Sequence, residues 1–245
     1  MLPKFEFFGE VFFTYPLLMG VAWGIAVQMA RRLNLASSSP LQHLNFYLIG
    51  LFITSWTGAK VFYALTADFE YKNSVLAHSD FWFGGGFVFY GGLVFGLAFT
   101  FLFGIKTRQP MPRFNIFVPA LAIGHALGRV GCFLAGCCYG LAHEGPLSIP
   151  LQGVERLPTQ LFEAAALLVF CLVALRPGAL VKKNLIMNYF LFYAVTRFLL
   201  EFLRADAVRG VWFMGVSTSQ IVSIILMLGL ASFYVFKAKS RGLCP

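Results

Sequence analysis

The sequence predicts an all-α, polytopic membrane protein with seven transmembrane helices, its N-terminus outside and its C-terminus in the cytoplasm. Of its 245 residues, 59% are hydrophobic and 12% are charged, whereas a soluble domain carries about 25% charged residues. The mean hydropathy is +0.76. Apolar runs recur along the chain, most of them near the roughly 20 residues that a helix needs to cross a bilayer. Basic residues gather in alternate connections between these runs.

Seven apolar runs define the expected transmembrane helices, and the fifth is the shortest. In chain order they are residues 11–30, 44–66, 87–105, 114–132, 160–175, 185–203 and 217–236.

The first run is expected to be a retained helix rather than a cleaved signal. Residues 1–10 hold one lysine and two glutamates instead of a cationic leader, and the run that follows is long and ends at Arg31 and Arg32. The chain shows no internal repeat, low-complexity tract or long linker, so residues 1–245 are expected to form one membrane domain. The connections at 67–86 and 134–159 hold much of the glycine, proline and polar content, and such loops on rigid helices often carry sites.

The net charge of +9 is explained by membrane topology. If the seven runs are threaded in order, 11 of the 19 basic residues lie on one side of the membrane. They are Arg31, Arg32, Lys106, Lys182, Lys183, Lys237, Lys239, Arg108, Arg113, Arg176 and Arg241. Cytoplasmic loops carry an excess of lysine and arginine, so this side is the cytoplasm. The basic residues therefore do not call for a nucleic-acid partner.

Residues 128–140 carry the densest polar signal in the chain. Arg129 stands there beside Cys132, Cys137, Cys138 and four glycines, at the end of an apolar run. Burying a guanidinium in hydrocarbon costs at least ~2.5 kcal/mol, so an arginine at such a position usually serves a polar site. Glycines let backbone amides approach a ligand closely, as phosphate binding requires. The segment predicts an anion-binding active site at a membrane surface.

Two of the expected helices each carry a polar stripe with the spacing i, i+4, i+7. The stripes are His125, Arg129 and Cys132 in the fourth helix, and Arg197, Glu201 and Arg204 in the sixth. Such stripes cannot face lipid and must face each other, a cavity or water. Surplus positive charge in that space suits a phosphate group.

Structural explanations compete with a functional one for several of these charges. Arg204 can extend to the membrane interface, and Lys60 can pair with a carboxylate or a lipid headgroup. Arg197 and Glu201 can form a purely structural buried pair. Arg129 is the hardest to explain in this way, because glycines and thiols crowd it.

The cysteine cluster allows several interpretations, and the sequence does not choose among them. The C-x4-C-C spacing is not that of a known structural zinc site, so no metal and no other cofactor is expected. Cys132 can form a disulfide with Cys137 or Cys138 if the segment faces an oxidising exterior. Alternatively, one thiol is a nucleophile or transient acceptor activated by Arg129. All three can also be small packing residues.

At these residues the chain resembles the prolipoprotein diacylglyceryl transferase family. That family's signature runs roughly G-R-x-G-N-F-x-N-G-E-x-x-G. It is matched here by Gly128, Arg129, Gly131, Phe133, Gly136 and Gly140. Further matches, in the family's order over nearly the whole chain, are Tyr15, Gly91 with Gly92, the run 158–163, the R-F-x-x-E-F-x-R pattern of 197–204, and Gln220.

The chain departs from the family at four polar positions. Tyr90 stands where a histidine usually precedes the paired glycines, and Lys60 replaces an arginine. Cys132 and Cys137 occupy the asparagine and glutamate positions of the signature. The arginines on the phosphate side are retained.

The resemblance implies a transferase that moves a diacylglyceryl group from phosphatidylglycerol, or a similar glycerophospholipid, to a lipoprotein cysteine or a related acceptor. This reaction alkylates a thiolate at a glyceryl carbon while glycerol phosphate leaves. It needs a base for the acceptor thiol and cations for the departing phosphate. The implied partners are the phospholipid and a prolipoprotein signal peptide, and the implied location is the bacterial cytoplasmic (inner) membrane.

Specific roles follow for the catalytic residues. Arg129 is expected to hold the phosphate with support from Arg197, while Glu201 orients the arginines. Tyr90 is the expected proton acceptor and His125 a substitute for it. Among the three cysteines, Cys132 is the one whose thiol is expected to take part in the reaction. The expected substrate-binding residues are Tyr15, Lys60, Gly91, Gly92, Gly131, Gly136, Gly140, Gln160, Glu163 and Arg204. The competing hypothesis is a non-catalytic or redox-regulated lipid-binding relative, in which the cysteines form a regulatory disulfide.

Overall fold

The computed structural model describes residues 4–7, 10–66, 87–151, 153–176, 184–205 and 215–239. Within these ranges the chain forms seven α-helices, one 3-10 helix and two short antiparallel hairpins. The helices are α1 (Thr14–Leu35), α2 (Leu44–Thr66), α5 (Phe89–Lys106), α6 (Val118–Leu134), α7 (Thr159–Leu175), α8 (Leu185–Glu201) and α9 (Thr218–Lys239). The 3-10 helix η1 (Met111–Phe117) precedes α6, and the strands are β1 (Lys4–Phe7), β2 (Glu10–Phe13), β3 (Ile149–Leu151) and β4 (Val154–Arg156).

Each expected helix has a counterpart, but two begin three or four residues later than expected. The first was expected from residue 11, yet residues 10–13 form β2, which pairs with β1, so α1 begins at Thr14. The fourth was expected from residue 114, where the chain instead forms η1 before α6 begins at Val118. Pro110 is the N-cap of η1 and Pro112 lies in its first turn, where proline is tolerated because no N–H is needed there.

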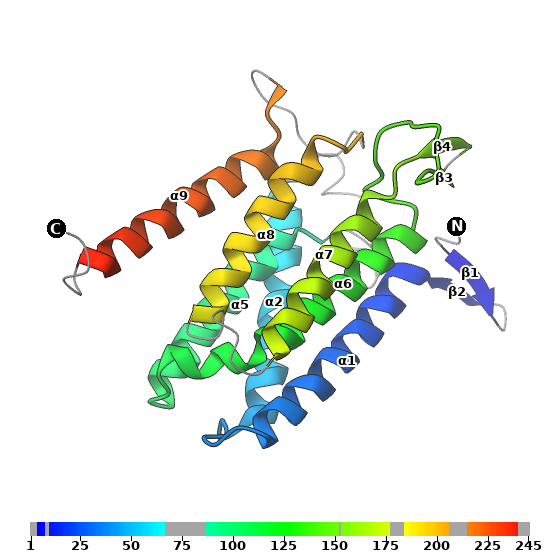
Figure 1. The fold of residues 1–245 in the computed structure, drawn as a ribbon. Coiled ribbons are helices and arrows are strands. Elements are labelled where there is room, and N and C mark those ends of the chain that lie inside the picture. Colours follow the sequence, from blue (N-terminus) through cyan, green and yellow to red (C-terminus); the bar gives the residue numbers. More distant parts are fainter. Residues whose placement is uncertain are drawn as a thin grey trace.

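The helices form one bundle in which neighbours along the chain are often neighbours in space (Figure 1). Helix α6 packs between α1 and α7, α2 packs on α5, and α9 packs on α8. The core between α6, α7 and α8 contains Ala122, Ala126, Ala164 and Ala174. Small side chains let membrane helices approach closely, where packing and interhelical hydrogen bonds hold them together.

The outer surface of the bundle is apolar, as a membrane location requires. Ile53, Leu102, Leu172 and Leu228 lie on four different helices and are each more than half exposed. Three helical segments of the described chain are long and apolar enough to span a bilayer: Leu44–Leu65, Met111–Leu134 and Thr218–Phe236. Gly91–Lys106 and Thr159–Leu175 are shorter apolar helices.

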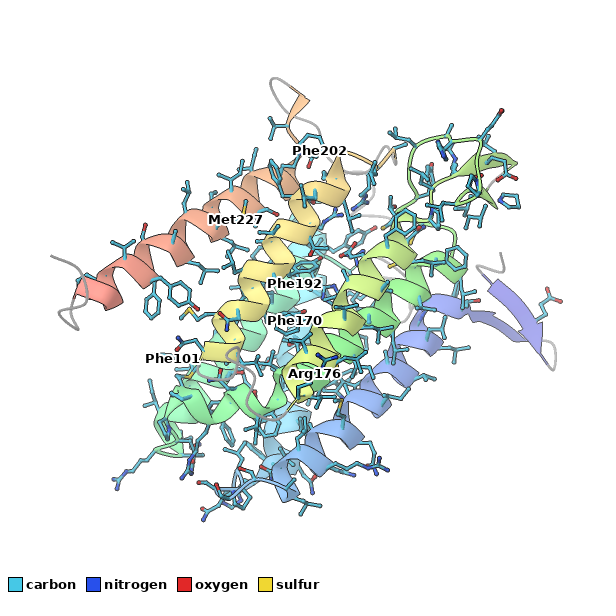
Figure 2. The ribbon with its side chains drawn as sticks, viewed as in Figure 1. Phe101, Phe170, Arg176, Phe192, Phe202 and Met227 are labelled. Atoms are coloured by element: carbon cyan, nitrogen blue, oxygen red, sulfur yellow. The ribbon has the colours of Figure 1, made fainter. Side chains whose placement is uncertain are left out.

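The two ends of the bundle differ. Both hairpins lie at one end, beside the start of α1 and the start of α7 (Figure 1). Figure 2 places Phe202, just after α8, and Arg176, just after α7, at opposite ends of the bundle. Phe170 and Phe192 lie between these ends, on α7 and α8, and their ring centroids are 5.1 Å apart.

The α2–α5 contact depends on glycine. A Cβ on Gly91 would lie 2.3 Å from the carbonyl oxygen of Gly58, and one on Gly92 would lie 3.0 Å from that of Ser55. Two helix backbones therefore touch at this crossing, which only glycine allows. This packing explains Gly91 and Gly92 without a substrate, and their expected binding role stays a prediction.

We expect Gly91→Ala to destabilise the protein by about 1–3 kcal/mol, because the new methyl group forces α2 and α5 apart. The control is Gly24→Ala in α1, where a Cβ would have no atom within 4 Å. Thermal unfolding in detergent micelles measures both changes. Equal stability of the two variants would show that the α2–α5 crossing is not limited by Gly91.

Candidate active site

Four helix ends meet at the end of the bundle that carries the hairpins. Helices α1 and α6 run antiparallel, since Gly124 lies against Ala26 while Gly131, two turns later, lies against Tyr15. The start of α1 therefore lies beside the end of α6. The start of α7 and the end of α8 join them there, as the ion pairs described next show.

Four buried charged side chains and the partly exposed Arg129 form a continuous chain of ion pairs across these helix ends. Arg129 Nε lies 2.8 Å from Glu163 Oε1, and Glu163 Oε2 lies 3.9 Å from Arg197 Nη1. Arg197 Nη2 lies 2.7 Å from Glu201 Oε2, which is 3.8 Å from Arg204 Nη1. The two polar stripes expected from the sequence thus face each other, and Glu163 of α7 joins them.

Among the described residues, the ion-pair chain holds three arginines and two carboxylates, which is one more positive than negative charge. The side chain of Glu163 is 4% exposed and that of Arg129 is 13% exposed. Within the described residues, Arg197 Nη1 and Glu201 Oε1 are buried and have no hydrogen-bond partner. Buried charges need partners, so this cluster is suited to an anion that would balance the extra cation.

Two tyrosines of α8 connect the stripes. The Tyr193 hydroxyl donates to Glu163 Oε1 at 2.9 Å and accepts from Arg129 Nη2 at 3.2 Å. One turn earlier, the Tyr189 hydroxyl lies 2.8 Å from His125 Nδ1. The imidazole is also enclosed by aromatic rings, with the Phe89 ring stacked on it at 5.0 Å.

Tyr189 and Tyr193 were not among the site residues predicted from the sequence. The sequence does contain a pattern that indicates them. Four polar residues follow one another at four-residue intervals on one helix face: Tyr189, Tyr193, Arg197 and Glu201. A buried tyrosine needs a partner for its hydroxyl. Extending the stripe towards the N-terminus of the helix would have found both residues.

The loop after α6 is held by the start of α7. Gln160 Nε2 donates to the Cys137 carbonyl at 2.6 Å, and the Thr159 hydroxyl donates to the Cys138 carbonyl at 3.0 Å. Gly136 and Cys138 both have left-handed backbones, with φ of 72° and 63°. These two residues fold the loop back towards the end of α6, so Gln160 positions the loop backbone.

The fold gathers the three cysteines. The sulfur atoms of Cys132, Cys137 and Cys138 all lie within 4.8 Å of one another. Hydrogen bonds from the Cys132 and Cys137 thiols, with Arg129 and Arg204 close by, lower the pKa of the Cys138 thiol. The expected participation of Cys132 in the reaction stays a prediction.

Gly140 joins the same loop to the end of α8. Its N–H donates to the Leu157 carbonyl at 3.0 Å, and it pairs with Arg204 in an isolated antiparallel bridge. A Cβ on Gly140 would lie 2.6 Å from that Leu157 oxygen, so no larger residue fits. Gly140 thus sets where the backbone of Arg204 lies.

Other expected site residues lie around this centre. The ring of Tyr15 lies against Gly131, and its centroid is 6.3 Å from that of Phe87. Lys60 is buried, with Nζ 4.0 Å from the centroid of the same Phe87 ring. Tyr90 belongs to the first turn of α5, and its side chain lies outside what the structure describes.

Comparison with known proteins identifies a family. A family model described as prolipoprotein diacylglyceryl transferase matches residues 5–236. Phosphatidylglycerol–prolipoprotein diacylglyceryl transferase 2 of Clostridium perfringens (strain 13 / Type A) is 30% identical over 96% of this chain and 95% of its own length. The phosphatidylglycerol–prolipoprotein diacylglyceryl transferase of Clostridium tetani (strain Massachusetts / E88) is 27% identical over 97% of this chain and 98% of its own length. The enzyme of the same name from Streptococcus suis (strain 05ZYH33) is 31% identical over 80% of this chain and 77% of its own length.

Glu163→Gln should destabilise the protein by about 3–5 kcal/mol, because it leaves the buried Arg129 and Arg197 without the carboxylate between them. The matched control is Glu155→Gln on exposed β4. Unfolding in detergent would measure the difference. A loss no larger than that of the control would mean that Glu163 is not the centre of the ion-pair chain.

Proposed function

Because the chain belongs to the prolipoprotein diacylglyceryl transferase family, we propose that it transfers a diacylglyceryl group from phosphatidylglycerol to the sulfur of a lipoprotein cysteine. The observation that carries this proposal is the buried ion-pair chain with its surplus positive charge. A phosphate that leaves during transfer needs a fixed cation beside it. In a water-poor site, a preorganised cation is worth more than it would be in water.

The proposed reaction exchanges one bond for another at a glyceryl carbon. The acceptor thiol loses its proton, and the resulting sulfur attacks the carbon that is bound to the phosphate oxygen. A carbon–sulfur bond forms while the carbon–oxygen bond breaks. Glycerol phosphate leaves with the bonding electron pair, so negative charge increases on the phosphate and must be stabilised there.

Arg129 is proposed to supply that stabilisation. Its Nε faces Glu163 and its Nη2 donates to Tyr193, so its remaining terminal nitrogen can meet a phosphate oxygen. Arg197 and Glu201 keep this arrangement in place through their own ion pair. Arg204, at the other end of the ion-pair chain, provides a second cation towards the loop.

The proton acceptor is proposed to be Tyr90 or His125. His125 Nδ1 is already bonded to the Tyr189 hydroxyl, which leaves only Nε2 for an acceptor thiol. Tyr15, Lys60 and the glycines around them are proposed to line the route of the lipid.

We also propose that residues 1–245 form one domain with seven membrane-crossing helices in the bacterial inner membrane. The N-terminus would be outside, as would the hairpin end of the bundle. The segregation of basic residues supports this orientation, as does the apolar surface of the helices. A lipoprotein signal peptide would then meet the site from the outer face.

Arg129→Lys should lower transfer at least tenfold, because it keeps the charge but loses the planar fork that grips a phosphate. The control is Arg32→Lys, the same exchange on an exposed side chain. Mass spectrometry of a test lipoprotein, incubated with phosphatidylglycerol and each protein, measures the added diacylglyceryl group. No transfer by the unaltered protein would refute the proposed function, and full transfer by Arg129→Lys would refute the role of Arg129.

The orientation can be tested with alkaline phosphatase, a reporter that is active only outside the cytoplasm. A fusion after Glu144, next to the β3–β4 hairpin, should be active, and a fusion after Arg176 should be inactive. Comparable activity in both would contradict a membrane crossing by α7.

A further inference from the structure

Cys132, Cys137 and Cys138 form the one group of three metal-ligating side chains found in the described part of the chain. Cys132 belongs to the last turn of α6, and the other two belong to the loop after it. Their sulfur atoms lie within 4.8 Å of one another. Thr159 and Gln160 hold the backbone of this loop in place, so the three sulfurs are gathered before any ligand arrives.

We propose that these three cysteines bind a thiophilic divalent metal ion of the zinc class, and that its open coordination position takes the thiol of the acceptor cysteine. The first half of this proposal stands on the cysteine geometry alone. The second half rests on the proposed function.

The spacing of the sulfurs suits such an ion. A Zn–S bond is about 2.3 Å, so two sulfurs of a tetrahedral site lie roughly 3.8 Å apart. The distances between the sulfur atoms would need to shorten by no more than about 1 Å, which rotation of the side chains can supply. The short C-x4-C-C spacing gave no such indication in the sequence, because the left-handed Gly136 and Cys138 are what turn the loop back.

The surroundings balance the charge of the site. Three thiolates and one divalent ion together carry one negative charge. Arg129 and Arg204 lie close enough to interact electrostatically with Cys138, so two guanidinium groups lie near the thiolates. Ligands that an arginine neutralises are less costly to keep in surroundings of low polarity.

The exposure of the three cysteines differs in a way that leaves one side open. Cys132 is buried and Cys138 is half-buried, whereas Cys137 is exposed. Catalytic zinc sites have three protein ligands and an open fourth position. Here the fourth position would face the side of Cys137, where water or an incoming thiol can enter.

A metal ion at this position would supply what thiol alkylation needs. A thiol that coordinates zinc is deprotonated, and its proton would pass to water on the open side. The bound sulfur would then attack the glyceryl carbon, and glycerol phosphate would leave towards Arg129. The metal is neither oxidised nor reduced. In this scheme the metal and water take the place of Tyr90 or His125 in removing the proton.

Metal binding is tested on the full-length protein in detergent micelles. The protein is first reduced and stripped of metal, then incubated with Zn²⁺, and the excess ion is removed. Elemental analysis should find about one zinc per chain in the unaltered protein and in Cys171→Ser, whose thiol is buried elsewhere in α7. Cys137→Ser and the triple serine variant should retain at least tenfold less. Zn²⁺ should also slow maleimide labelling of the cluster.

Two results would overturn the metal half. One is zinc retention by the unaltered protein no higher than that of Cys137→Ser, with no protection from maleimide. The other is a fully reduced preparation that loses two hydrogen atoms in mass on exposure to air even with Zn²⁺ bound, because a disulfide would then be the preferred state. Both measurements use the unaltered protein, so misfolding of a variant cannot decide the matter.

The acceptor half is tested by transfer to a lipoprotein peptide before and after stripping the metal with a chelator. Removing the ion should lower transfer at least tenfold, and adding Zn²⁺ should restore it. Undiminished transfer by the stripped protein would overturn this half and leave Tyr90 or His125 as the base. Zinc binding without transfer in any sample would refute the proposed function, and with it the acceptor half, while the metal half would stand.

Discussion

The burial of four charged side chains, together with the partly exposed Arg129, at one end of a membrane bundle is the constraint on which the rest of the structure depends. Each charge would be costly in hydrocarbon alone, so Arg129, Glu163, Arg197, Glu201 and Arg204 must alternate in sign and lie close together. That requirement fixes the relative rotation of α6, α7 and α8. It also leaves one cation in excess, which is the chemical property that the proposed reaction uses.

Backbone features elsewhere serve to keep this arrangement in place. Alanines in the core between α6, α7 and α8 let the helices approach closely enough for the 2.8 Å ion pair between Arg129 of α6 and Glu163 of α7 to form. Gly140 ties the loop after α6 to Arg204, and Gln160 ties the same loop to α7. Positioning and chemistry are therefore divided between neighbouring residues: Gln160 and Gly140 hold the loop, while the arginines and thiols are the groups proposed to contact the ligands.

Most of the helices could be predicted from the sequence, because a bilayer demands long apolar runs that few other structures produce. The two stripes of α6 and α8 were also predictable, since their spacing repeats every three or four residues. The hairpins were not, because strands of three or four residues leave no distinctive pattern. The close approach of Cys137 and Cys138 to Cys132 could not be predicted either. It depends on a left-handed backbone at Gly136 and at Cys138, and the second is not a glycine. The role of Tyr90 as proton acceptor stays a prediction.

The central claim is that the surplus cation of the ion-pair chain is a phosphate site. The most direct measurement is an experimental structure of the protein in lipid nanodiscs with a phosphonate analogue of phosphatidylglycerol, whose carbon–phosphorus bond cannot be cleaved in the transfer. The phosphonate oxygens should lie within hydrogen-bond distance of Arg129, on the side of the ion-pair chain that faces Cys138. A headgroup bound beside Lys60 or elsewhere, with Arg129 still held only by Glu163 and Tyr193, would contradict it.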